Sequence, residues 1–432
     1  MIYSQTFKQY KKYIPIIKNF LAYSLGSVVQ RSITAITSLL ALRIISPSKF
    51  GLLSLINQFM FLLPIFLNLG LRQAFWLEYF HIKSAERRTL INYIILIYLI
   101  IALLLLFFSF LNVKTINRYF FLNQASYAII IAAISYSFIQ FFSELYLQVL
   151  RNQMNAIRLT IIQLTAALLT ITLNVILVFY YCIGIIGIVL SNLAGITLIA
   201  LIGFYHYFQC NTHCYIIRKN LTKQAKYLLI LGFPFIPNIL FSWILSSGDR
   251  WILAYITDMK TVGIYALADM VGQIFNMCIL YPMNATYIPY MLNQYAKHTD
   301  KINEIEKQNR KNMWYAMVTT FILITIGTLV ASILGPYILP PKYLESLNYI
   351  WFILIGYVFF MGTYFSSCIL VFKKRIWLLL GINTIAASTN IILNLILIPS
   401  FKIYGCVTAT MISYIIFFYL NLNASKKANE CY

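Results

Sequence analysis

Apolar runs of about twenty or more residues recur along the whole chain, and they constrain its fold more than any other feature. A helix needs roughly 20 such residues to cross the hydrocarbon core of a bilayer. A signal peptide would account for only one short run at the start. We therefore predict an all-α integral membrane protein with about twelve transmembrane helices. The expected spans are 19–43, 52–79, 89–111, 125–149, 158–180, 184–207, 227–253, 262–288, 313–335, 346–371, 376–398 and 403–422.

Composition supports the same conclusion. The 432 residues are 61% hydrophobic and 10% charged, with a mean hydropathy of +0.79. A water-soluble core cannot bury that much apolar surface, so the chain belongs in a bilayer.

The sequence also repeats itself at about half its length. The stretch from Ser46 to Gly51 is echoed by the stretch from Thr257 to Gly263. A second echo relates Asn174, which precedes Gly184 and Gly187, to Asn394, which precedes Gly405. Both offsets are about 210–220 residues, the length of six spans, and an even number of spans gives the halves the same orientation. We predict two six-helix bundles, residues 1–210 and 211–432.

The basic residues indicate the orientation of the chain. The 33 Lys and Arg outnumber the 11 Asp and Glu, which gives a formal charge of +22. When the predicted loops are counted alternately, 23 basic residues fall on the side of the N-terminus and eight on the other. Cytoplasmic loops carry such an excess, so we predict cytoplasmic termini and no nucleic-acid partner. Arg31 and Arg72 fall within predicted spans, where the loop rule does not explain them.

Polar residues at three- and four-residue steps form stripes on five predicted spans. Polar side chains inside a bilayer meet other helices or line a water-filled cavity. These stripes therefore mark the helices that we expect around a cavity, although packing between helices remains open for each one, and Arg72 could instead snorkel from a helix end. The charged members are Arg31, Arg72, Glu144, Arg151, Asp249 and Asp269.

Motifs for catalysis are missing from the sequence, which contains no GxSxG, HExxH or Walker loop. We predict that the protein is not an enzyme and uses no cofactor. His206, Cys210, His213 and Cys214 cluster between two spans, but their spacing matches no standard zinc site. We predict no metal site, and a carrier is the function class that remains.

Three stretches carry a family resemblance. They are RIISPSKFGLLSL, LNLGLRQAFWLEY and GFPFIPNILFSWILSSGDRWILAYITDMKTVGIYALADM, which begin at Arg43, Leu67 and Gly232. In these the chain resembles the Wzx-type polysaccharide (O-antigen or capsule) flippases of the multidrug/oligosaccharidyl-lipid/polysaccharide (MOP) exporter superfamily.

The resemblance implies twelve helices in two lobes around a cationic cavity. It also implies alternating-access transfer of an undecaprenyl-pyrophosphate-linked oligosaccharide from the cytoplasmic to the periplasmic leaflet of the bacterial inner membrane. The implied partners are this lipid-linked substrate, membrane lipids, and a glycan polymerase or other polysaccharide assembly proteins.

We expect Arg31, Arg72 and Arg250 to bind the anionic part of the substrate, because Arg can hold phosphate with two parallel hydrogen bonds. Asp249, Asp269 and Glu144 are the candidates for coupling or gating. Asp249 could instead pair with Arg250 or Arg31, which would compensate a buried charge.

The same carboxylates keep open a cation-coupled multidrug (MATE-like) exporter of the superfamily. A third hypothesis is a membrane scaffold for glycan assembly that does not transport.

Overall fold

The computed structural model describes residues 41–79, 87–153, 155–209 and 221–430. Within these ranges the regular structure is entirely helical, and ten helices are long and apolar enough to cross a membrane. The prediction of an all-α, multi-pass membrane protein is confirmed. The first predicted span, 19–43, lies almost wholly outside the described residues.

The chain divides into two compact units. Unit 1 comprises Met1–Ile44 and Ile56–Ile236, and unit 2 comprises Ile45–Leu55 and Pro237–Tyr432. Helix α2 therefore begins in unit 2 and continues in unit 1. The division at residue 210 that the repeat suggests stays a prediction.

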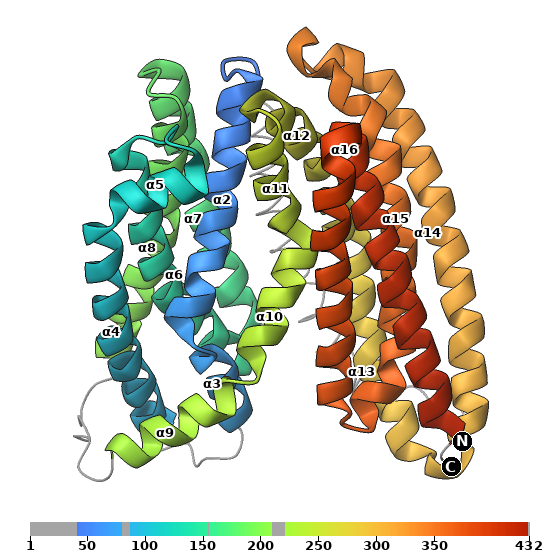
Figure 1. Ribbon diagram of the computed structural model, residues 1–432. Helices are drawn as coiled ribbons and strands as arrows, with labels where there is room; N and C mark the ends of the chain where they lie inside the picture. The colour runs from blue at the N-terminus through green and yellow to red at the C-terminus, as the bar shows by residue number, and fades with distance from the viewer. Residues whose placement is uncertain (1–40, 80–86, 154, 210–220, 431–432) are drawn as a thin grey trace, which may run out of the picture. The chain divides into compact units, whose positions relative to one another are not determined.

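Unit 1 is a bundle of helices (Figure 1). Its helices are α2 (Pro47–Asn68), α3 (Leu71–Glu78), α4 (Arg87–Leu111), α5 (Val113–Phe121), α6 (Tyr127–Asn152), α7 (Ala156–Asn174), α8 (Ile185–Gln209) and α9 (Leu221–Gly232). A π-helical turn, Val175–Tyr180, extends α7.

The core of unit 1 forms where α3, α4, α6 and α9 meet. The Tyr98 ring stacks on Phe141 at a centroid distance of 3.6 Å, and the Tyr98 hydroxyl donates to the carbonyl oxygen of Phe138 at 2.7 Å. A buried Tyr hydroxyl usually has a hydrogen-bond partner, and here the α6 backbone provides it. This contact fixes α4 against α6.

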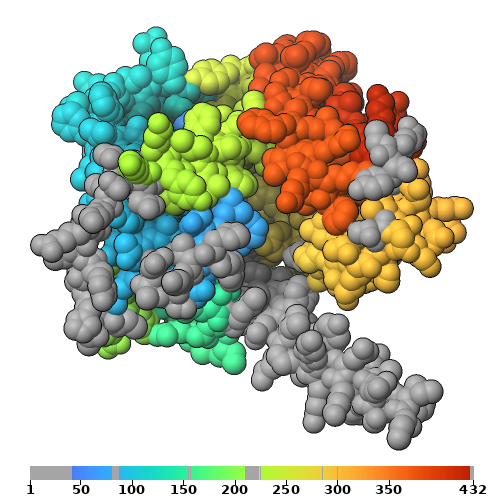
Figure 2. All heavy atoms as spheres, turned by 90° about the horizontal axis from the view of Figure 1, so that it is seen from below, coloured from blue at the N-terminus to red at the C-terminus, as the bar shows by residue number. Residues whose placement is uncertain are grey.

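The predicted span 52–79 is divided into α2 and α3 by a break at Leu69 and Gly70. Both residues have left-handed backbone angles, with φ of 43° and 74°. The backbone of Gly70 packs directly on that of Gly232, where a Cβ on Gly70 would lie 2.1 Å from the Gly232 carbonyl oxygen. This close approach needs glycine at both positions, because a Cβ on either residue would meet the backbone of the other. It brings the end of α9 onto the break, and Figure 2 shows α9 lying beside α3 at this end of unit 1.

Unit 2 contains the remaining helices. They are α10 (Phe235–Trp243), α11 (Asp249–Ile256), α12 (Met259–Phe275), α13 (Tyr281–Lys297), α14 (Ile302–Ile338), α15 (Leu347–Phe372) and α16 (Ile376–Glu430). Two π-helical turns, Ile244–Gly248 and Asn276–Leu280, join α10 to α11 and α12 to α13, so that each pair forms one span. Short 3₁₀ turns precede α14 and α15.

Helix α16 is two helices joined at a sharp turn. Lys402 has φ 49° and ψ −121°, which no helix accommodates. After this turn Gly405 packs on the preceding helix, and a Cβ on Gly405 would lie 2.4 Å from the Leu397 carbonyl oxygen. The turn separates the predicted spans 376–398 and 403–422. In the first half, Gly187 packs against Leu177 after a turn at Cys182 and Gly184, as the second sequence echo suggests.

The first sequence echo also has a structural counterpart within unit 2. Ser46 accepts a hydrogen bond from the Lys49 N–H at 3.4 Å, and Asp258 accepts one from the Thr261 N–H at 2.7 Å, so that each residue caps a helix. The hydrogen bond from Thr261 lowers the pKa of Asp258 below its ordinary value.

The echoed glycines face one another. A Cβ on Gly51 would lie 2.2 Å from the Met259 carbonyl oxygen, and a Cβ on Gly263 would lie 1.9 Å from that of Pro47. The first turns of α2 and α12 therefore meet backbone to backbone, as small residues allow between membrane helices.

We expect Gly51→Ala and Gly263→Ala to lower the thermal unfolding temperature of the detergent-purified protein. The added methyl group cannot fit beside a carbonyl oxygen unless the helices separate. Gly381→Ala is the matched control, because nothing lies within 4 Å of a Cβ at Gly381 in α16. Alanine there should be neutral or slightly stabilising, since it favours helix over glycine. Equal unfolding temperatures for all three variants would contradict the close contact.

Candidate functional site

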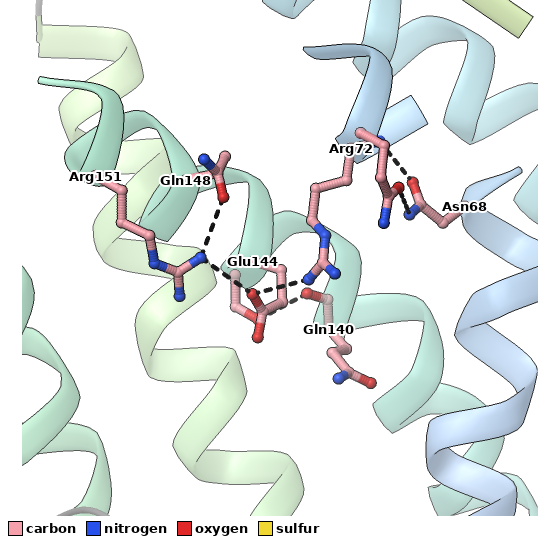
Figure 3. A network of polar contacts seen from close by, with 8 residues as sticks. Asn68, Arg72, Gln140, Glu144, Gln148 and Arg151 are labelled. Atoms are coloured by element: carbon pink, nitrogen blue, oxygen red, sulfur yellow. Dashed lines mark hydrogen bonds and ion pairs between the residues drawn. The ribbon is translucent and has the colours of Figure 1, made fainter. Parts of the chain in front are cut away.

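A cluster of charged and amide side chains lies on α3 and α6 of unit 1 (Figure 3). The break before α3 positions Arg72 in this cluster. At the break the Asn68 side chain accepts a hydrogen bond from the Arg72 N–H at 3.0 Å, which pairs one of the free N–H groups at the start of α3. Arg72 then reaches α6, where its Nη1 donates to Oε2 of Glu144 at 3.2 Å.

Glu144 is shared between two arginines. Arg151, two helical turns further along α6, places its Nη1 3.8 Å from the same Oε2 and donates to Gln148 at 3.2 Å. The side chains of Arg72, Glu144 and Arg151 are 39%, 30% and 39% exposed. We name these three residues the Arg72 cluster. Its two cations and one anion leave one positive charge on an accessible surface.

A second cluster lies in unit 2, and it is buried. Arg250 at the start of α11 forms an ion pair with Asp269 of α12, and the two side chains are only 2% and 7% exposed. Gln273 donates a further hydrogen bond to Asp269 at 2.7 Å. The π-helical turn that ends at Gly248 shifts the register of the backbone just before Asp249 and Arg250. Such turns often occur at functional sites.

Asp249 forms no ion pair in this cluster. Its Oδ2 accepts hydrogen bonds from the Tyr265 hydroxyl and, at 3.4 Å, from Thr410 of α16. Its Oδ1 is buried and has no hydrogen-bond partner among the described residues. Unpaired buried oxygens are costly, so this atom indicates a site for an additional donor or cation.

A small polar cavity adjoins Asp249 and Asp269. Its volume is about 10 Å³, close to the minimum that holds one water molecule. Its polar lining comes from Ser246, Asp249, Tyr265, Asp269 and Thr410, and Tyr357 and Tyr414 close it. We name Asp249, Arg250, Asp269 and Tyr265 the Asp249 cluster. If its ionisable groups other than Tyr265 are all charged, it carries one negative charge.

The structure places the predicted residues in two sets. Arg72 and Glu144 lie together in unit 1, and Arg250, Asp249 and Asp269 lie together in unit 2. Arg31 falls outside the described residues. The suggested pairing of Asp249 with Arg250 is wrong, because Arg250 pairs with Asp269 one helix away.

Sequence reasoning missed Thr410 altogether. It lies 161 residues from Asp249 in a run with few polar neighbours, and only the packing of α16 against α11 brings the two together. No group of three or more metal-binding side chains occurs in the part of the chain that the structure describes. Cys210, His213 and Cys214 lie outside that part.

Solved structures with the same fold include transporters and a flippase. The lipid II flippase MurJ in an inward closed conformation superposes with a TM-score of 0.72 at 16% identity, covering 94% of this chain and 87% of MurJ. An inward-facing MATE family multidrug resistance transporter of the MOP superfamily gives 0.69 at 13% identity, covering 95% of each chain. A Vibrio cholerae MATE transporter gives 0.66 at 14% identity, covering 97% of each. At these identities the likeness establishes the fold.

No curated protein sequence matches the chain significantly. A sequence family does match it, over residues 16–295, which is more than half of its length. The match includes all residues of the Arg72 cluster and all four residues of the Asp249 cluster. The chain belongs to the polysaccharide biosynthesis protein family and has the fold of the MOP superfamily transporters.

Proposed function

We propose that the protein is a flippase that moves an undecaprenyl-pyrophosphate-linked oligosaccharide, an O-antigen or capsule repeat unit, across the membrane by alternating access. Its family supports a role in polysaccharide synthesis, and its fold is shared with a lipid II flippase. The observation that carries the proposal is the Arg72 cluster, an exposed positive site among apolar helices. We place the protein in the bacterial inner membrane with both termini in the cytoplasm, in keeping with the loop charges.

The Arg72 cluster can exchange one anion for another. Glu144 lies near only the Nη1 of each arginine. Each guanidinium therefore keeps other N–H groups that can donate hydrogen bonds to a phosphate oxygen. A pyrophosphate that approaches the cluster competes with Glu144 for Arg72 and Arg151. Binding would therefore release a carboxylate that the empty site holds in place, which gives the site two arrangements.

Arg31 and Arg250 complete the predicted set of cavity cations. Arg31 remains a proposed substrate contact on the basis of its sequence position. Arg250 is proposed mainly as the partner of Asp269, because a side chain that is 2% exposed does not reach a large headgroup without a change of conformation. Glu144 acts as the gating residue of unit 1 in this scheme.

The Asp249 cluster supports ion coupling, and it favours a second candidate function, a cation-coupled exporter like the MATE transporters of this fold. A proton or a small cation on Oδ1 of Asp249 would satisfy the unpaired oxygen and neutralise the excess negative charge. Occupancy of this site would change the packing of α16 on α11 and α12. Both functions can use the same coupling step, but only the flippase requires the Arg72 cluster.

We expect Arg72→Ala to reduce transport of a lipid-linked oligosaccharide in proteoliposomes by about tenfold or more, because charge-assisted hydrogen bonds are worth about 1.5–3 kcal/mol. Arg72→Lys should retain part of the activity, since it keeps the charge but loses the planar fork. Arg118→Ala, on the surface helix α5, is the matched control. Monodisperse elution on size exclusion establishes that each variant is folded.

A double variant separates substrate binding from simple charge pairing. If Arg72 only neutralises Glu144, then Glu144→Gln should restore transport to the Arg72→Ala protein. We expect no restoration, because the substrate loses its cation in both proteins. Full restoration, or normal transport by Arg72→Ala alone, would remove Arg72 from the binding site.

We expect Asp249→Asn to abolish the response of transport to pH and sodium. The protein should stay folded, because Asp249 forms no ion pair among the described residues and its removal leaves no unpaired cation. Asp269→Asn should instead destabilise the fold, since an unpaired buried Arg250 costs about 3–5 kcal/mol. The measurements are transport rates at varied pH and sodium, and thermal unfolding. Asp300→Asn, at an exposed turn, is the control for both. An unchanged ion response in Asp249→Asn would exclude it as the coupling site.

A further inference from the structure

A separate cavity of about 460 Å³ lies between α4, α6 and α8 of unit 1. This volume is in the range of sites that enclose much of a small ligand. One end of the cavity is formed where helices begin or end, by Arg87, Arg88, Arg158 and His206. The other end of the cavity, which extends along α4 and α6, is lined by Ile91, Ile95, Phe142, Leu145 and Val149.

The described residues that line the cationic end include no acid. None of the residues described as lining the cavity is acidic, and neither Arg87 nor Arg158 forms an ion pair within the described ranges. Arg87 lies over the Tyr79 ring at 4.3 Å, and its buried Nε has no hydrogen-bond partner among those residues. Arg158 contacts the ring of His206, which is uncharged when it accepts a hydrogen bond. A buried donor without an acceptor, here Nε of Arg87, indicates an anion-binding site.

The apolar end continues directly from these cations. Arg87, Ile91 and Ile95 follow one another at four-residue steps, so they share one face of α4. Gln153 directly follows the end of α6, and Val149 and then Leu145 lie progressively further from that end. The cavity is therefore positively charged at a helix end and apolar towards the membrane interior. A lipid with an anionic headgroup has the complementary arrangement.

This cavity is distinct from the Arg72 cluster. Residues advance by about 100° each around a helix. On that basis the lining residues Phe142 and Tyr146 lie about 160° around α6 from Glu144. The two sites lie on opposite faces of the same helix, so the cavity is not part of the proposed path of the cargo.

We propose that this cavity binds one anionic phospholipid of the surrounding membrane. Its phosphate contacts Arg87 and Arg158, and the start of an acyl chain lies against Ile91, Ile95 and Val149. Basic pockets between transmembrane helices are suited to such headgroups. The lipid would hold α4, α6 and α8 together. It would thereby stabilise α6, the helix that carries Glu144 and Arg151 of the Arg72 cluster. The proposal does not depend on the identity of the cargo.

The test measures binding of phosphatidylglycerol and phosphatidylcholine to the purified full-length protein by native mass spectrometry, with thermal unfolding as a second readout. We expect one phosphatidylglycerol to bind in preference to phosphatidylcholine and to raise the unfolding temperature. The double variant Arg87→Ala/Arg158→Ala should weaken this binding by about tenfold or more. Arg87→Lys/Arg158→Lys should retain most of it, and it serves as the folded reference if the alanine variant is unstable.

A second pair of variants tests the apolar half of the site. Ile95→Trp fills the cavity without changing its charge, and we expect it to weaken lipid binding. Leu104→Trp is the matched control, because Leu104 lies on the same helix and is 58% exposed. Arg118→Ala is the control for loss of charge.

Three outcomes would overturn the proposal. One is equal binding of the two lipids, and another is unchanged phosphatidylglycerol binding in both double variants. The third is a thermal shift that inorganic phosphate alone reproduces and Ile95→Trp does not affect, which would assign the arginines to a free anion.

Discussion

The structure depends on one constraint, which is that lipid offers no hydrogen bonds to a peptide backbone or to a charged side chain. Every described segment with regular structure is helical, because only a helix satisfies its own backbone groups inside a bilayer. The same constraint governs the places where helices break. At Gly70 and at Lys402 the chain turns sharply, and in each case the turn is packed against backbone, at Gly232 and at Leu397 respectively. Breaks in these helices therefore coincide with glycine-mediated contacts.

Charges inside the helices are compensated in two different ways. The Arg72 cluster is partly exposed, its ion pairs are longer than 3 Å, and it retains an excess positive charge. Exposed pairs of this kind contribute little to stability, so a bound anion can replace Glu144 at low cost. The Arg250–Asp269 pair is buried, and separation of its partners would leave an uncompensated charge. The first arrangement suits exchange of ligands, whereas the second suits a fixed framework beside the unpaired oxygen of Asp249.

Helix α6 contributes residues to both proposed sites of unit 1, the Arg72 cluster and the lipid cavity. One of its faces carries Glu144 and Arg151, and the opposite face lines the cavity with Phe142 and Tyr146. Since both faces belong to one helix, a lipid that fixes the position of α6 also fixes the positions of Glu144 and Arg151. Transport through this face would then respond to the composition of the membrane, without any direct contact between lipid and cargo.

Apolar run length and residue spacing are local properties, so the amino-acid sequence alone was enough to predict a helical membrane protein and to suggest an internal repeat. It also indicated Arg72, Glu144, Asp249 and Asp269, since ionisable residues in apolar helices stand out. It could not show that Arg72 begins a separate helix, because that break depends on Gly70 meeting Gly232 from a distant segment. The fold was needed to show that Arg250 pairs with Asp269, that Thr410 reaches Asp249, and that Arg87 and Arg158 line one cavity. Each of these depends on contacts between helices that are far apart in the chain, which residue spacing does not encode.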